Sequence, residues 1–176
     1  MSAPFYEFDE VDTFTAAAIG EPGSRVFYLH ARAGQQRVTV KCEKQQVTAI
    51  AAYLRRVLSD LPPPEDRPLP LDLRDPGEQA FVLGPIGLGY DRGNDRLLVQ
   101  LEEVSAATDD DDDEDDDEPA LVDDDPDRGH VRLYVTRSQA AAFCEYADEL
   151  VAAGRPNCQW CGNPIDPDGH PCPRMN

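Results

Sequence analysis

The stretch RVTVKCEKQQVTAIAAYLRRVLSDL, residues 37–61, decides the fold class of this chain. Residues 37–42 alternate polar and apolar side chains, which is the period-two pattern of a half-buried strand. From residue 44 to about residue 61 the apolar side chains recur every three or four positions, which predicts an amphipathic helix. Pro62-Pro63-Pro64 ends this helix, because proline lacks the N–H donor and disfavours helix in the preceding residue. The first unit predicted is therefore a strand that passes directly into a helix.

A second unit of the same kind lies further along the chain. Residues 130–135 (HVRLYV) alternate in the same way, and a helix is predicted from Thr136, its N-cap, to about residue 153. The two helical segments overlay at an offset of 93 residues, so that Gln46 meets Gln139. An ancestral duplication and the chance likeness of two amphipathic helices both explain this overlay.

Short strands are predicted in front of both units, because β-branched and aromatic residues cluster there between turns rich in glycine and proline. These strands cover residues 5–18, 25–33, 80–89 and 96–104. The expected fold class is α+β, with two similar antiparallel-strand-plus-helix halves at about residues 5–61 and 80–154. Together the halves form one domain over residues 1–154.

The net charge of −19 comes mostly from one segment. Fourteen of the 35 acidic residues lie between Asp109 and Asp127, and the rest of the chain carries a net charge of only −5. Because consecutive like charges repel one another, a disordered, solvated insert is predicted at about residues 105–128. The alternatives are a docking segment for a basic partner and weak condensation of Ca²⁺ or Mg²⁺, although the run lacks the glycine and spaced ligands of a calcium-binding loop.

The C-terminal tail, residues 155–176, carries the most specific chemistry. It brings three thiols and one imidazole into a short segment: Cys158, Cys161, His170 and Cys172. These residues match the Cys₃His donor set of a tetrahedral Zn²⁺ site, and Gly162 allows the backbone to curl so that N–H groups point at sulfur. Four protein ligands leave no open position for a substrate, so the predicted zinc is structural and orders a tail that has almost no core of its own.

A disulfide and a thioredoxin-like redox pair are the alternatives to this zinc knuckle. A disulfide does not suit a cytoplasmic chain. A redox motif normally opens a helix in a βαβ unit, whereas these cysteines lie in a proline-rich tail. If His170 or Cys172 fails to reach the metal, Asp166, Asp168 or a second chain could replace it.

Composition predicts a cytoplasmic protein and excludes several kinds of partner. No apolar run approaches the ~18 residues of a membrane span, and the N-terminus lacks the basic start and apolar stretch of a signal peptide. Cys42 and Cys144 stand singly in apolar surroundings, as reduced core residues do. Nucleic acid is not an expected partner, because the tail offers only Arg155 and Arg174 and the acidic insert repels phosphate.

Polar residues gather where the strand 37–42 enters the first helix. The candidates are Arg25, Glu43, Lys44 and Gln46. Such residues cap helices, which is the favoured interpretation, or they line an anion-binding pocket.

Two other features resemble functional motifs and receive structural interpretations. Gly84, Gly87 and Gly89 lie inside a predicted strand with no helix after it, so bulges or close backbone contacts explain them better than a dinucleotide-binding loop. His30 and His130 have no nucleophile and acid arranged beside them in the sequence, and they are interpreted as structural or surface residues.

Motifs from the whole chain together resemble one family. They are Gly20-Glu21-Pro22-Gly23-x-Arg25, Glu43-Lys44-Gln45-Gln46, Leu88-Gly89-Tyr90-Asp91 and the tail motif with Cys158-x-x-Cys161-Gly162 and His170-x-Cys172-Pro173. This combination is similar to the actinobacterial family called domain of unknown function 3090, although Gln159 stands where the family usually has proline and the acidic insert is long. The resemblance implies an accessory role, since members tend to be encoded near a histidine-phosphatase-like protein and a lipid-kinase-like protein. It also marks the four candidate pocket residues as positions that the family shares.

Two functions from different classes fit these features. The first is a non-catalytic interaction or adaptor protein, in which the zinc tail is a rigid docking element and the acidic insert attracts an unknown, basic protein partner. The alternative is a small-ligand-binding protein or enzyme that uses a pocket near the candidate residues. Side chains that converge on a cleft would favour the alternative, and side chains that only cap the helix would count against it.

Overall fold

The structure is a computed structural model that describes residues 3–66, 68, 76–105, 127–165 and 169–174. Most of the predicted acidic insert and the alternative ligands Asp166 and Asp168 therefore lie outside the described residues.

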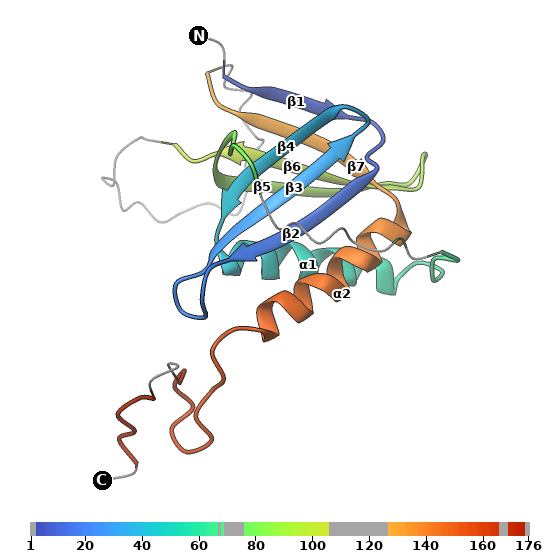
Figure 1. The fold of residues 1–176 in the computed structure, drawn as a ribbon. Helices are drawn as coiled ribbons and strands as arrows, with labels where there is room; N and C mark the ends of the chain where they lie inside the picture. Colours follow the sequence, from blue (N-terminus) through green and yellow to red (C-terminus); the bar gives the residue numbers. More distant parts are fainter. Residues whose placement is uncertain (1–2, 67, 69–75, 106–126, 166–168, 175–176) are drawn as a thin grey trace, which may run out of the picture.

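A seven-stranded, mainly antiparallel sheet combines with two helices, which confirms the predicted α+β fold class. The elements are β1 (Phe5–Phe8), β2 (Thr13–Ile19), β3 (Val26–Ala33), β4 (Gln36–Cys42), α1 (Lys44–Ser59), β5 (Phe81–Asp91), β6 (Arg96–Glu103), β7 (His130–Val135) and α2 (Arg137–Ala152). Both helices lie on the same side of the sheet and pack against each other (Figure 1). Neither is long and apolar enough to cross a membrane, and the same holds for every helix of the described residues.

The sheet consists of two similar halves joined side by side. Its strand order is β1-β7-β6-β5-β4-β3-β2. In one half the antiparallel strands β2, β3 and β4 lead into α1, and in the other β5, β6 and β7 lead into α2. The pairing registers correspond, because Phe27 faces Cys42 in the first half and Leu97 faces Val135 in the second. The parallel pairing of β4 with β5 joins the halves.

The single strand predicted over residues 5–18 is wrong, because this segment forms two strands at opposite edges of the sheet. β1 pairs in parallel with β7, whereas β2 pairs with β3. Polar residues between them interrupt the alternation, and the side chain of Asp12 accepts a hydrogen bond from the backbone N–H of Gly34 at 2.7 Å. The Gln139 amide donates to the carbonyl of Val11 at 2.6 Å and holds the break against the start of α2.

In the second half of the sheet, the corresponding irregularity is a bulge within β5, which remains one continuous strand. β5 pairs first with β4 and then with β6, with a bulge between Leu83 and Ile86. At this bulge the Gln46 amide donates to the carbonyls of Leu83 and Gly84 at 3.2 and 3.1 Å. Gln46 and Gln139 are each the third residue of a helix, and each also accepts a bond from the N-cap backbone. The two glutamines that overlay in the sequence therefore make corresponding hydrogen bonds, because each caps its own helix and holds a strand irregularity. An ancestral duplication of the two halves stays a prediction.

The core lies between the helices and one face of the strands. Phe143 of α2 is 1% exposed and stacks on Phe14 of β2, with ring centroids 4.6 Å apart. Where the helices meet, the Cys144 thiol donates to the carbonyl of Ala51 at 3.4 Å. These apolar contacts are the main source of stability, because burial of apolar surface is the dominant favourable term in folding.

Gly84 sits where the backbones of β5 and β6 come very close. A Cβ atom at this position would lie 2.7 Å from Cα of Val104 and 3.0 Å from its N, so the backbone itself would have to move. Gly84→Ala is expected to lower the free energy of unfolding by about 1–3 kcal/mol, the usual cost of overpacking. Gly89→Ala in the same strand is the control, since its nearest contacts would be 3.8 Å away on Leu98. Urea denaturation of both variants tests this, and equal losses would contradict it.

Candidate metal centre and the adjoining pocket

The tail forms a tight knuckle beyond the end of α2. Asn157 and Pro164 form an isolated antiparallel bridge, and the backbone N–H of Cys158 donates to the carbonyl of Asn163 at 2.7 Å. Inside this bridge the N–H of Gly162 donates to the carbonyl of Cys158 at 2.8 Å. Gly162 has φ +75°, a conformation that glycine adopts without strain, so this turn depends on it. Cys158 and Cys161 both belong to this turn.

The four predicted ligands come together in the structure. One donor atom from each of Cys158, Cys161, His170 and Cys172 lies within 4.8 Å of the other three. The sulfurs of Cys158 and Cys172 are 3.9 Å apart, close to the ~3.8 Å between two thiolates of a tetrahedral zinc with Zn–S of about 2.3 Å. Sγ of Cys161 is 3.2 Å from Nε2 of His170. The cluster could therefore hold a metal ion, and among the described residues it is the one group of this kind.

The surroundings of Cys158 favour its thiolate form. The backbone N–H groups of Cys161 and Trp160 donate to its sulfur and lower the pKa of the thiol. The distance from N of Trp160 to Sγ of Cys158 is 3.4 Å. Cys158 is also the most buried of the four, with 6% exposure. Because the thiolate is the form that binds metal, these N–H groups prepare the site for a cation.

All five cysteines are free thiols, so the disulfide alternative is not realised. Burial raises the pKa of Cys42 to about 12 and that of Cys144 to about 11, which supports their interpretation as reduced core residues.

We expect Ellman's reagent at pH 8 to modify none of the five thiols rapidly while metal is bound, and to modify the three tail thiols once a chelator is added. Only a denaturant is expected to expose Cys42 and Cys144. Rapid reaction of either core thiol in the folded chain would contradict this assignment.

The four candidate pocket residues divide into two pairs. Arg25 and Lys44 line a pocket of about 260 Å³ between the β2–β3 turn, the start of α1 and the tail. Glu43 is instead the N-cap of α1, and Gln46 completes its capping box. Arg155 also lines this pocket. Its role as a pocket residue was missed from the sequence, although its position between Gly154 and the cysteine motif was a signal for it.

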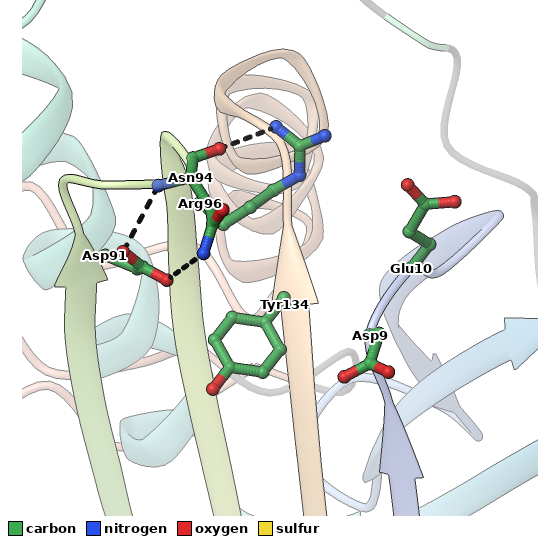
Figure 2. A pocket seen from close by; sticks show the side chains of 6 residues that line it. All are labelled: Asp9, Glu10, Asp91, Asn94, Arg96 and Tyr134. Carbon is green, nitrogen blue, oxygen red and sulfur yellow. Dashed lines mark hydrogen bonds between the residues drawn. The ribbon is translucent and has the colours of Figure 1, made fainter.

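A larger pocket, about 580 Å³, opens at the other half of the sheet. Asp91 and Asn94 from the β5–β6 turn lie on one side, and Asp9 and Glu10 after β1 lie on the other (Figure 2). Asp91 accepts bonds from the side chain and backbone of Asn94 at 2.8 and 3.2 Å, which lower the pKa of its carboxyl group. The carboxylate of Asp91 therefore fixes the turn that follows β5.

Comparison with known families accounts for nearly the whole chain. Residues 6–172 match the family described as "Protein of unknown function (DUF3090)". The chain belongs to the DUF3090 family. The DUF3090 match spans all four metal-ligand candidates and every residue that lines the 260 Å³ pocket. No curated protein and no solved structure matches the chain.

Proposed function

We propose that the Cys₃His cluster binds one structural Zn²⁺ and that the protein acts as a non-catalytic adaptor in the cytoplasm. The observation that carries the proposal is the closed donor set, with all four donor atoms within 4.8 Å of one another. Three thiolates and one imidazole suit zinc better than hard cations, and a four-ligand site leaves no position for substrate or water. The metal would then stabilise the knuckle and not carry out a reaction.

The knuckle offers an aromatic contact to a protein partner. Trp160 lies between Cys158 and Cys161 and is 57% exposed, an unusual place for a large apolar side chain. Tryptophan is enriched among residues that dominate interface energies. A metal-fixed loop holds it at low entropic cost, because the bound conformation exists before binding. The net charge of −19 favours a basic partner.

Trp160→Ala tests the adaptor role without removing a metal ligand. We expect the tagged full chain to retain a specific protein from native-host lysate at physiological salt, and the variant to lose it while keeping its metal content. Trp160 is the only tryptophan, so its fluorescence also reports docking when the captured protein is purified and titrated back. Phe5→Ala, which removes another exposed aromatic (62%) from a distant edge strand, is the matched control. Equal capture by wild type and Trp160→Ala would refute the proposed docking element.

Ligand binding is the second candidate function, and one observation favours it. Arg25 and Lys44 both face the same 260 Å³ pocket, as a binding site requires. Glu43 and Gln46 do not support it, since their contacts serve helix capping.

A further inference from the structure

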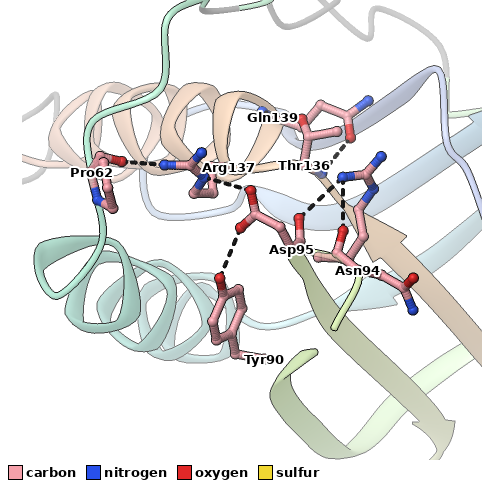
Figure 3. A network of polar contacts seen from close by, with 8 residues as sticks. Pro62, Tyr90, Asn94, Asp95, Thr136, Arg137 and Gln139 are labelled. Atoms are coloured by element: carbon pink, nitrogen blue, oxygen red, sulfur yellow. Dashed lines mark hydrogen bonds and ion pairs between the residues drawn. The ribbon is translucent and has the colours of Figure 1, made fainter. Parts of the chain in front are cut away.

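At the start of α2, a cationic side chain is neutralised by a carboxylate from the turn between β5 and β6. Arg137, the first residue of α2, forms an ion pair with Asp95 at 3.0 Å between Nε and Oδ2. The other oxygen of Asp95 accepts a bond from the hydroxyl of Tyr90 at 2.8 Å. Figure 3 shows Asp95 between Tyr90 and Arg137, with Arg137 reaching on to the carbonyl of Pro62.

The corresponding positions in the other half hold two cations. Arg25 precedes Phe27 by two residues as Asp95 precedes Leu97, and these two apolar residues occupy the same register in the two halves. Lys44 is the first residue of α1, as Arg137 is of α2. Where the second half has the carboxylate of Asp95, the first half therefore has the guanidinium of Arg25. The helix beside it, α1, begins with a cationic residue just as α2 does.

The geometry brings these two cations close together. A Cβ atom on Gly154 would lie 3.1 Å from Nη2 of Arg25 and 3.2 Å from Nζ of Lys44, so both groups point at the same spot. In the part of the chain that the structure describes, neither forms an ion pair with a carboxylate. Arg25 donates through Nη1 to the carbonyl of Leu150 at 3.1 Å and lies over the ring of Phe27 at 5.2 Å, which fixes the guanidinium in place.

The pocket in front of the pair is open to a small anion. Its remaining wall includes the tail residues Arg155, Asn157 and Pro164, and none of the acidic residues that the structure describes lines it. Arg155 packs against the backbone of Gly23, where a Cβ atom would lie 3.2 Å from Nε. Two like charges held together repel each other, and an anion between them removes this repulsion.

We propose that this pocket binds a phosphoryl group, held by Arg25 and Lys44. A phosphoryl group carries about two negative charges near pH 7, which matches two cations. The planar guanidinium donates to two of its oxygens, and the ammonium acts as a compact point charge. This inference deepens the ligand-binding candidate and is independent of the adaptor role. The shared chemistry belongs to free phosphate and to a phosphate monoester alike.

Isothermal titration calorimetry on the full, metal-loaded chain tests the pocket with two probes, inorganic phosphate and glycerol 3-phosphate. We expect saturable binding at one site per chain. Tighter binding of glycerol 3-phosphate identifies a phosphorylated small molecule as the ligand, and tighter binding of inorganic phosphate identifies the free ion. Lys44→Gln is expected to weaken binding tenfold to about a hundredfold, the range for loss of one charge-assisted hydrogen bond.

Lys41→Gln is the matched control, because Lys41 is an exposed lysine three positions earlier that does not line the pocket. It is expected to leave both affinities unchanged. Absence of saturable binding to the wild type would overturn the proposal, as would equal weakening in Lys44→Gln and Lys41→Gln. Metal content and partner capture are measured on the same samples, so failure of the phosphate site is separable from failure of the adaptor role.

Discussion

Cys158→Ser is expected to lower the metal content of the purified chain from about one zinc ion per chain to nearly none. Cys158 is the most buried of the four candidate ligands, and backbone N–H groups support its thiolate. Its own N–H and carbonyl also close the knuckle through Asn163 and Gly162. A serine hydroxyl is a poor zinc ligand at neutral pH, so the remaining three donors no longer form a closed site.

Metal analysis after gel filtration measures this loss, and Trp160 fluorescence reports the knuckle at the same time. The emission of Trp160 is expected to shift to that of a fully solvated, mobile indole. Cys144→Ala is the control, because it removes a buried thiol that lies outside the cluster and leaves the four donors intact. Unchanged metal in Cys158→Ser, or equal loss in Cys144→Ala, would contradict the assignment. Unchanged unfolding of the rest of the chain would support the predicted boundary between residues 154 and 155.

Phe143→Ala is expected to lower the free energy of unfolding by about 3–5 kcal/mol, the usual cost of emptying a buried aromatic site. Phe143 is 1% exposed and stacks on Phe14, so the substitution leaves a cavity between α2 and β2. Ile50 occupies the corresponding position of α1 and is also fully buried. Ile50→Ala is therefore expected to cost about 2–5 kcal/mol.

Urea denaturation followed by far-ultraviolet circular dichroism measures these losses. Phe5→Ala is the control, because Phe5 is 62% exposed on an edge strand, and its loss is expected to stay below about 1 kcal/mol. A Phe143→Ala chain as stable as the Phe5→Ala chain would show that the helices do not form the core.

Much of the fold could be predicted because its signals are local. The alternation of residues 37–42 and 130–135 and the helical periodicity after them predicted β4, α1, β7 and α2, and Thr136 is the N-cap that the sequence indicated. The bulge at Gly84 also follows the prediction, since glycines inside a strand mark close backbone contacts. Strand pairing is different, because it joins residues far apart in sequence. Nothing local to residues 5–18 indicates that β1 pairs with β7 while β2 pairs with β3.

The candidate sites divide in the same way. The candidate metal ligands were predictable as a cluster because they lie within one short tail and their spacing suits a single ion. The pocket was predictable only in part. Arg25 and Lys44 meet because β3 and α1 belong to the same half, whereas Glu43 and Gln46 lie equally near in sequence but face the helix cap. Arg155 enters from the tail, a contact that depends on where α2 ends.

The most direct test of the account is the absorption spectrum of the full chain with Co²⁺ in place of zinc. Three thiolates and one imidazole around a single ion predict one Co²⁺ per chain, with the intense d–d bands of tetrahedral cobalt and a strong thiolate-to-metal charge-transfer band. Weak bands of octahedral cobalt without charge transfer, or no binding at all, would contradict the central claim that Cys158, Cys161, His170 and Cys172 close one structural metal site.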